Sequence, residues 1–97
     1  MNYSDRKACS HKKLKRVEWS IVKRIISILY YDGGMKKTNI SMKCALGYDK
    51  CVLYLDWMEM LDLITREIDE QGFQLIRLSQ RGKSLYELYY REIHIAS

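Results

Sequence analysis

The spacing of apolar side chains predicts helices near the start and in the middle of the chain. Over residues 13–31 and 48–62 apolar positions recur every three or four residues, the period of one helix face. Residues 38–45 are expected to form a short helix that starts with polar side chains, and residues 79–96 are expected to form a last helix. Two strand-type runs, 63–68 and 73–78, flank a polar turn at 69–72.

Glycine and small hydroxyl residues mark where these elements begin and end. Asp32-Gly33-Gly34 is expected to end the first helix, with glycine supplying the left-handed cap. Thr38 and Ser79 are expected to cap the N-termini of the second and last helices. Gly47 is expected to permit the tight turn between the second and third helices.

Two helices joined by a short glycine turn and followed by a hairpin are the plan of a winged helix-turn-helix, in which the second helix of the pair enters a DNA major groove. The predicted fold is α+β and mainly α, with three helices, a two-stranded wing and a C-terminal dimerisation helix. Residues 1–12 are expected to be a flexible basic arm and residues 13–97 a single winged-helix domain.

Apolar positions exceed what one small core needs. The first helix has an unusually wide apolar arc, and the last has two apolar lines, one of them rich in tyrosine. One line is expected in the core and the other at a dimer seam, the alternative being a tyrosine stripe on the surface of a monomer. The residues assigned to the seam are Trp19, Ile26, Tyr86, Tyr89, Tyr90 and Ile93.

The net charge of +5 is unevenly distributed. Basic side chains gather in residues 1–16 and around the helix-turn-helix, whereas residues 55–70 are acidic. A cationic surface of this kind attracts a polyanion, although a basic N-terminus can also be only a solvated tail.

Lysine and arginine are expected to bind phosphates and release counterions, which gives affinity without sequence information. Thr38 and Asn39, with the amides at the start of their helix, are expected to hold a further phosphate. The cations assigned to phosphates are Lys36, Lys37 and Lys43 in the helix-turn-helix and Arg6, Lys7, Lys12 and Lys13 in the arm.

Bases are expected to be read from the first turn of the third helix, by Tyr48, Asp49 and Lys50. Lysine can donate to guanine and aspartate can accept from cytosine. Tyr54 is a further candidate, provided that it is exposed. For each of these residues the alternative is plain helix surface, and Asp49 can simply stabilise the positive end of its helix.

The predicted wing is acidic at its tip, where Asp69 and Glu70 would be repelled by phosphates. Gln71 is the tip residue that can touch DNA, and Arg66 and Arg77 on the strands could reach the backbone.

Cysteine and histidine offer little chemistry. Cys44 and Cys51 flank the predicted turn. They are expected to be small buried side chains, the alternative being a disulfide between them. Cys9 and His11 lack a second pair at metal-ligand spacing, so no metal and no cofactor are predicted. With no phosphate loop and no nucleophile beside a base, an enzyme is not predicted. No apolar run is long enough to cross a membrane, and a cytoplasmic protein is expected, in the host cytoplasm if viral.

The chain resembles the small winged helix-turn-helix regulators common in archaea and their viruses, over roughly residues 17–93. The matching residues are Gly33-Gly34, Lys37-Thr38-Asn39-Ile40, Leu46-Gly47-Tyr48-Asp49, Tyr54-Leu55 with Leu63-Ile64, and Leu78-Ser79-Gln80-Arg81-Gly82. The resemblance implies a DNA-binding homodimer, often with a long C-terminal helix in the interface. Two features depart from the pattern: Asp62 replaces a common glycine before the wing, and the wing tip is acidic.

The functional hypothesis is a sequence-specific, double-stranded DNA-binding transcription regulator that acts as a homodimer. Two-fold symmetry would set the reading helices about one DNA turn, ~34 Å, apart on an inverted repeat. The alternative is a winged-helix module that binds another protein through the acidic surface of residues 56–70 and does not bind DNA.

Overall fold

The computed structural model describes residue 14 and residues 16–90. Helix α2 (Trp19–Asp32) begins six residues later than the predicted start at residue 13. Glu18, its N-cap, has extended backbone, and the Glu18 N–H donates to the Tyr54 hydroxyl at 2.9 Å. This contact ties Glu18 to the core, and residues 16–18 are not helical.

Much of the wide apolar arc of α2 is covered, although Trp19 at its start is exposed. Its buried side chains are Ile21, Val22, Ile25, Ile26 and Leu29. Ile26, predicted at a dimer seam, has no exposed surface in the single chain and is therefore a core residue. Gly33 has φ +79° and donates its N–H to the Leu29 carbonyl, which confirms the glycine cap.

The helix-turn-helix consists of α3 (Lys37–Lys43) and α4 (Tyr48–Met60). The prediction that Thr38 caps α3 is wrong, because the helix already includes Lys37 and its N-cap is Lys36. The left-handed residue of the turn is Ala45, with φ +56°, whereas Gly47 has an ordinary φ of −62°. Reciprocal hydrogen bonds between Ser41 and Leu46 close the turn around Ala45: the Ser41 Oγ donates to the Leu46 carbonyl and the Leu46 N–H to the Ser41 carbonyl.

The wing is an antiparallel hairpin of β1 (Ile64–Ile68) and β2 (Gln74–Leu78), with Ile64 opposite Leu78 and Ile68 opposite Gln74. The loop after α2 adds an isolated bridge, in which Met35 and Ile76 exchange backbone hydrogen bonds at 3.0 and 2.7 Å. Asp62, just before β1, has φ +62°. The left-handed backbone there is the physical reason why glycine suits this position.

The last helix starts as predicted, since the Ser79 Oγ accepts the Gly82 N–H at 3.0 Å. It runs as α5 (Gln80–Leu85) and widens into a π-helical turn, η1 (Tyr86–Tyr90). In this turn Tyr86 is buried, whereas Leu88 and Tyr89 are both exposed. Tyr86 is thus a core residue and not a seam residue.

Tyr86 joins η1 to the end of α2. Its ring stacks on that of Tyr30 at 4.3 Å between centroids, and its hydroxyl donates to the Tyr31 hydroxyl at 2.9 Å. The Tyr30 hydroxyl donates to a Glu87 carboxylate oxygen at 2.8 Å. These contacts anchor the start of η1 on the body of the fold. Ile93 lies outside the described residues.

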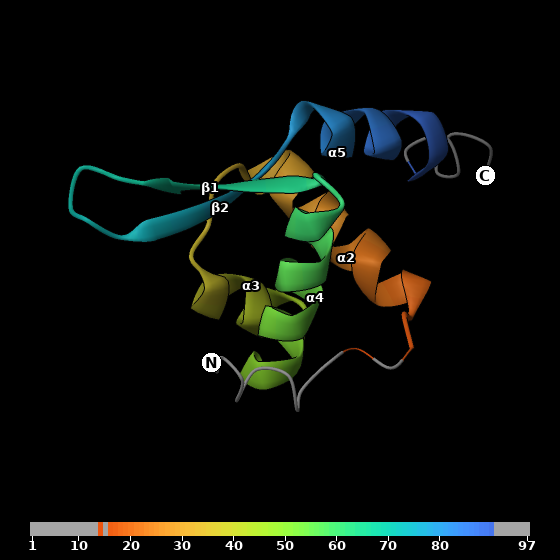
Figure 1. The fold of residues 1–97 in the computed structure, drawn as a ribbon, viewed down its shortest axis with the longest axis horizontal. Helices are drawn as coiled ribbons and strands as arrows, with labels where there is room; N and C mark the ends of the chain where they lie inside the picture. The colour runs from red at the N-terminus through yellow and green to blue at the C-terminus, as the bar shows by residue number, and fades with distance from the viewer. Residues whose placement is uncertain (1–13, 15, 91–97) are drawn as a thin grey trace, which may run out of the picture.

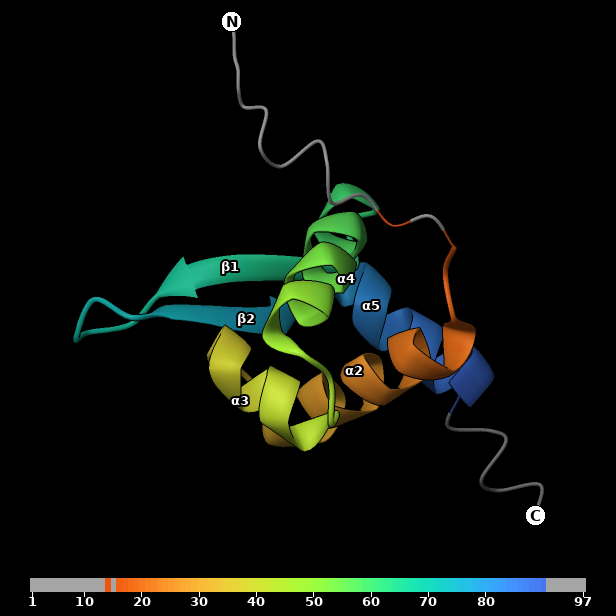
Figure 2. The same ribbon diagram turned by 90° about the horizontal axis from the view of Figure 1, so that it is seen from below.

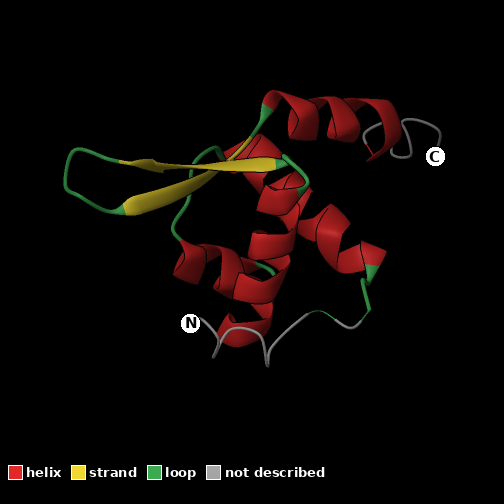
Figure 3. Ribbon diagram, in the orientation of Figure 1, coloured by secondary structure: helices red, strands yellow, loops and turns green. Residues whose placement is uncertain are grey.

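The arrangement confirms a mainly helical winged-helix fold. The hairpin projects from the helices, with α5 on one side of it and α3 on the other (Figures 1 and 3). Seen from below, α3 and α4 lie beside the base of the wing, and α2 lies behind them (Figure 2). The core between these elements takes Cys51, Tyr54, Leu55 and Met58 from α4, whereas Leu61, which follows the last turn of that helix, is 37% exposed.

Candidate nucleic-acid interface

The first turn of α4 is open to solvent. Gly47 precedes it in extended conformation, and the side chains of Tyr48, Asp49 and Lys50 are all exposed. This is the position at which a recognition helix meets base edges. The sequence prediction therefore identified residues that are accessible to a ligand.

Tyr54, one turn further along α4, does not belong to that surface. Its side chain is 0% exposed, and its hydroxyl accepts the Glu18 N–H. The condition attached to Tyr54 as a base-reading residue is not met, because the residue lies on the face of α4 that packs in the core.

Three separate segments meet beside this turn. Lys36, Lys37 and Thr38 from the start of α3, Tyr48 from α4, and Phe73 and Gln74 from the wing line one hollow of about 280 Å³. The Lys36 ammonium lies 3.6 Å from the centroid of the Phe73 ring, a cation–π contact. Asn39 is exposed on α3 next to this group. Lysines and hydroxyls in one hollow match the chemistry of a phosphate backbone.

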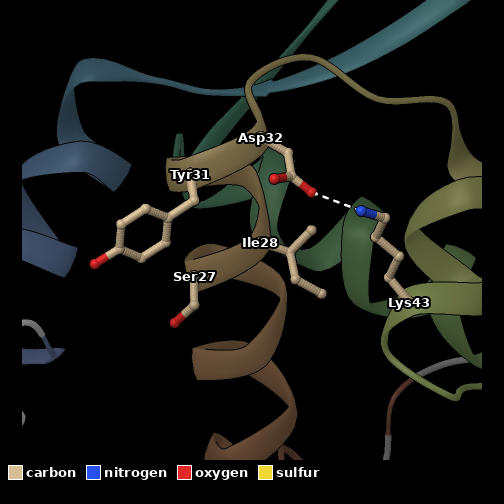
Figure 4. A pocket seen from close by; sticks show the side chains of 5 residues that line it. All are labelled: Ser27, Ile28, Tyr31, Asp32 and Lys43. Atoms are coloured by element: carbon tan, nitrogen blue, oxygen red, sulfur yellow. Dashed lines mark hydrogen bonds and ion pairs between the residues drawn. The ribbon is translucent and has the colours of Figure 1, made fainter.

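Lys43, at the other end of α3, is tied to α2. Its ammonium lies 2.9 Å from a carboxylate oxygen of Asp32. The pair borders a second hollow, of about 420 Å³, which is also lined by Ser27, Ile28 and Tyr31 (Figure 4). The charge of Lys43 is therefore partly compensated within the chain.

The arginines of the wing are also paired. Arg66 contacts Asp56 at 2.9 Å and Glu59 at 2.6 Å, both on α4. Arg77 contacts Glu67 on the neighbouring strand at 2.6 Å. The acidic surface around residues 56–70 is consequently neutralised in part by the wing itself.

The acid at the start of the wing tip has a structural role. One carboxylate oxygen of Asp69 accepts the backbone N–H groups of Gln71 and Phe73, at 2.9 and 2.8 Å. Gly72 has φ +89°, as the tight loop requires. Glu70 and Gln71 are exposed at the tip.

Two of the three cysteines, Cys44 and Cys51, lie in the described part of the chain. Cys44 and Cys51 are free thiols with no exposed surface, which agrees with small buried side chains and not with a disulfide. Burial raises the pKa of both thiols, that of Cys51 to about 11 with a further contribution from Cys44. Because the thiolate is the reactive form, this environment opposes oxidation.

An apolar groove lies on another part of the surface. Trp19, 60% exposed, meets the edge of Trp57 at 5.7 Å between ring centroids. The opening has a volume of about 400 Å³ and is also lined by Leu61, Leu63, Arg81, Ser84, Leu85, Leu88 and Tyr89. Trp19 and Tyr89 of the predicted seam lie here, while Tyr90 packs partly against the core.

Other predictions fall on segments that the structure does not describe. The arm residues Arg6, Lys7, Lys12 and Lys13 lie outside the described residues, as do Cys9, His11 and His94. Within residue 14 and residues 16–90, no group of three or more histidine, cysteine or acidic side chains is placed to hold a metal. In the same part of the chain, no helix has the length and apolar character needed to cross a membrane.

The sequence profile of the family described as winged helix-turn-helix matches residues 15–97. The chain belongs to this family. The match spans the helix pair, the wing and the last helix together, and the described fold has the same elements in the same order. A search of curated protein sequences finds no match.

Solved structures of transcription regulators share the fold of this winged helix-turn-helix protein. MepR, a transcription regulator of the Staphylococcus aureus multidrug efflux pump MepA, has a TM-score of 0.70 at 19% identity, covering 95% of this chain and 66% of that one. A MarR family protein from Bacillus stearothermophilus gives 0.70 at 22% identity, covering 94% and 63%. Ligand-free NadR gives 0.67 at 20% identity, covering 76% and 52%. This chain thus spans about half to two thirds of the length of these structures.

The sequence did not indicate that Phe73 and Gln74 line the hollow beside α4. It also did not indicate that Trp57, Leu61 and Leu88 line the apolar groove. Phe73 and Gln74 were assigned only to a strand, although an aromatic residue directly after an acidic turn is a visible feature. Nothing in the local pattern indicates that Phe73 meets Lys36, because the two residues are far apart in sequence.

Proposed function

We propose that this winged helix-turn-helix protein is a transcription regulator that binds double-stranded DNA sequence-specifically as a homodimer. The observation that carries the proposal is the convergence of Lys36, Lys37 and Thr38 with Tyr48 beside the exposed first turn of α4. Lysines there would hold phosphates while Lys50 and Asp49 approach base edges. An archaeal or archaeal-virus source is part of the proposal and is supported by the resemblance to those regulators. Action in the cytoplasm is also part of it, because a transcription regulator works where the DNA is.

The homodimer proposal rests on the apolar groove at Trp19, Trp57 and Leu88. Large apolar side chains exposed side by side are unusual on a lone monomer. A second copy is the occupant we propose, since residues predicted to continue the last helix follow directly after η1. Two-fold pairing there would present two copies of α4 to successive major grooves, about 34 Å apart.

Fluorescence anisotropy with a labelled random duplex tests DNA binding. We expect measurable affinity at low salt that falls steeply as salt rises, because each neutralised phosphate releases a counterion. Removing residues 1–13 is expected to reduce the slope, if the arm contacts phosphates. Selection of duplexes from a random pool is expected to yield an inverted repeat. No binding at low salt would favour the protein-binding alternative, in which the acidic surface at Asp56 and Glu59 meets a basic partner.

Sedimentation equilibrium tests the dimer. The unmodified chain is expected to have twice the mass of one subunit, and Leu88→Lys, at a 63% exposed position in the groove, is expected to give monomers. Met42→Lys is the matched control, because Met42 is 73% exposed on α3, away from the groove. A monomeric unmodified chain would contradict the homodimer.

A further inference from the structure

The wing of this protein has an unusual distribution of charge. Its own cations, Arg66 and Arg77, are held by the carboxylates of Asp56, Glu59 and Glu67. Its tip carries Glu70 and the internally bonded Asp69. Two paired arginines and an acidic tip give the wing little attraction for phosphates.

The cation nearest to the wing comes from another element. Lys36 belongs to the loop before α3, and its ammonium lies over the face of Phe73. Within residue 14 and residues 16–90, Lys36 has no carboxylate partner, in contrast to Lys43, Arg66 and Arg77. An aromatic face attracts the ammonium without neutralising its charge.

Both partners of this contact are fixed by backbone hydrogen bonds. The residue before Lys36, Met35, exchanges two hydrogen bonds with Ile76 of β2. Phe73 donates its N–H to the Asp69 carboxylate and accepts the Asp69 N–H at its carbonyl. The backbones on both sides of the contact are therefore fixed, and the face of the Phe73 ring restricts where the lysine charge can lie.

The Lys36 ammonium lies close to the proposed DNA-binding surface. The hollow that Lys36 and Phe73 share is also lined by Lys37, Thr38 and Tyr48. A cation held there stands beside the first turn of α4, between the helix pair and the wing.

We infer that Phe73 is a positioning residue, which holds Lys36 at the base of the wing for a DNA phosphate while the acidic tip stays off the duplex. The inference rests on the proposed function and deepens it, because it assigns the wing's contribution to one inter-element pair. Asp69 acts in this scheme through the backbone of Phe73, which explains why an acid is compatible with a DNA-facing hairpin.

A double-mutant cycle in duplex binding tests the inference. Phe73→Leu is expected to weaken binding about two- to five-fold, the range of a cation–π contact of this exposure. Lys36→Met is expected to lower the slope of log affinity against log salt by about 0.9, the share of one phosphate. In the Lys36→Met background, Phe73→Leu is expected to have no further effect. Phe73→Tyr, which keeps the aromatic face, is expected to retain the affinity of the unmodified chain.

Two controls separate positioning from general damage to the wing. Ile68→Leu changes another exposed apolar wing residue, and Glu70→Gln removes one charge from the tip; both are expected to bind within two-fold of the unmodified chain. Thermal midpoints of all variants are measured, so that binding is compared between folded proteins. A strong gain of affinity in Glu70→Gln would put the tip against phosphates and overturn the scheme.

The remaining outcomes distinguish this inference from the function on which it rests. If the unmodified chain binds duplex DNA but Phe73→Leu binds equally well, or loses the same factor with and without Lys36, the inference is wrong and the proposed function stands. If the unmodified chain binds no duplex at low salt, the proposed function fails and the inference with it.

Discussion

Gly82 packs directly against the carbonyl of Leu63. A Cβ added at Gly82 would overlap the Leu63 oxygen and come within 2.9 Å of a Leu78 methyl group. The same carbonyl accepts the Ser79 N–H at 3.0 Å, and the Ser79 Oγ donates to the Asp62 carbonyl at 2.6 Å. The close approach of α5 to the start of β1 therefore requires a residue without a side chain.

Gly82→Ala is expected to destabilise the fold by about 1–3 kcal/mol, the usual cost of forcing a methyl group into a packed site. Chemical denaturation monitored by circular dichroism measures it. Gly47→Ser is the matched control, since nothing lies within 4 Å of a Cβ at Gly47 and serine is a good N-cap for α4. Equal stability of Gly82→Ala and the unmodified chain would contradict the packing described above.

Ala45→Gly is expected to stabilise the protein by about 0.5–1 kcal/mol, because Ala45 adopts φ +56° and glycine does so without a Cβ penalty. Asp62→Gly, at φ +62°, is expected to gain less, since aspartate tolerates this region better than alanine does. Met42→Gly within α3 is the control and is expected to lose about 1 kcal/mol. Thermal unfolding of the three variants, measured in parallel with the unmodified chain, tests this. A lower stability of Ala45→Gly than of the unmodified chain would contradict the prediction.

Alkaline pH is expected to destabilise the fold through Cys51. Burial raises the pKa of this thiol from 9.0 to about 11. Between these two pH values the Cys51 thiol is protonated in the folded state and largely deprotonated in the unfolded state. The resulting stabilisation is fully present below pH 9 and is lost as pH rises through 11. Unfolding midpoints from pH 8 to 11 measure it. Cys51→Ala is expected to flatten the decline relative to the unmodified chain; an identical decline in both would exclude Cys51 as its source.

Asp32→Asn is expected to increase duplex affinity up to about five-fold, because it frees Lys43 from an exposed ion pair worth at most about 1 kcal/mol. The salt dependence is expected to steepen as well, if Lys43 then binds a phosphate. Glu87→Gln is the control: it also removes one negative charge, but from η1, where Glu87 accepts a hydrogen bond from Tyr30. η1 continues α5, and α5 lies on the other side of the wing from α3 (Figure 1). An equal gain in both variants would indicate a general charge effect and not the release of Lys43.

Local chemistry explains why much of the fold could be predicted. The cap of α2 at Gly33, the Ser79 cap of α5 and the exposed first turn of α4 depend on neighbouring residues, and the structure agrees with each. The wrong predictions concern positions whose conformation or burial depends on residues far away in the sequence. Residues 13–18 have a helical pattern, but the hydroxyl of Tyr54 holds the backbone at Glu18 in extended form.

The burial of two predicted seam residues has the same kind of cause. Ile26 and Tyr86 carry apolar surface that could equally face a core or a partner. The packing of α2 against the other elements, together with the π-helical turn that begins at Tyr86, places both side chains in the core. Sequence periodicity cannot report either feature.

By itself, the order of helical, turn and strand patterns determined that this chain is a winged helix-turn-helix, because period, caps and turn residues act over a few positions. The tertiary structure alone decided which charges are compensated and which are available: it paired Lys43 with Asp32 and Arg66 with Asp56, and set Lys36 over Phe73. Electrostatic and aromatic contacts depend on distances of a few ångströms between segments remote in sequence, and those distances exist only once the chain is packed.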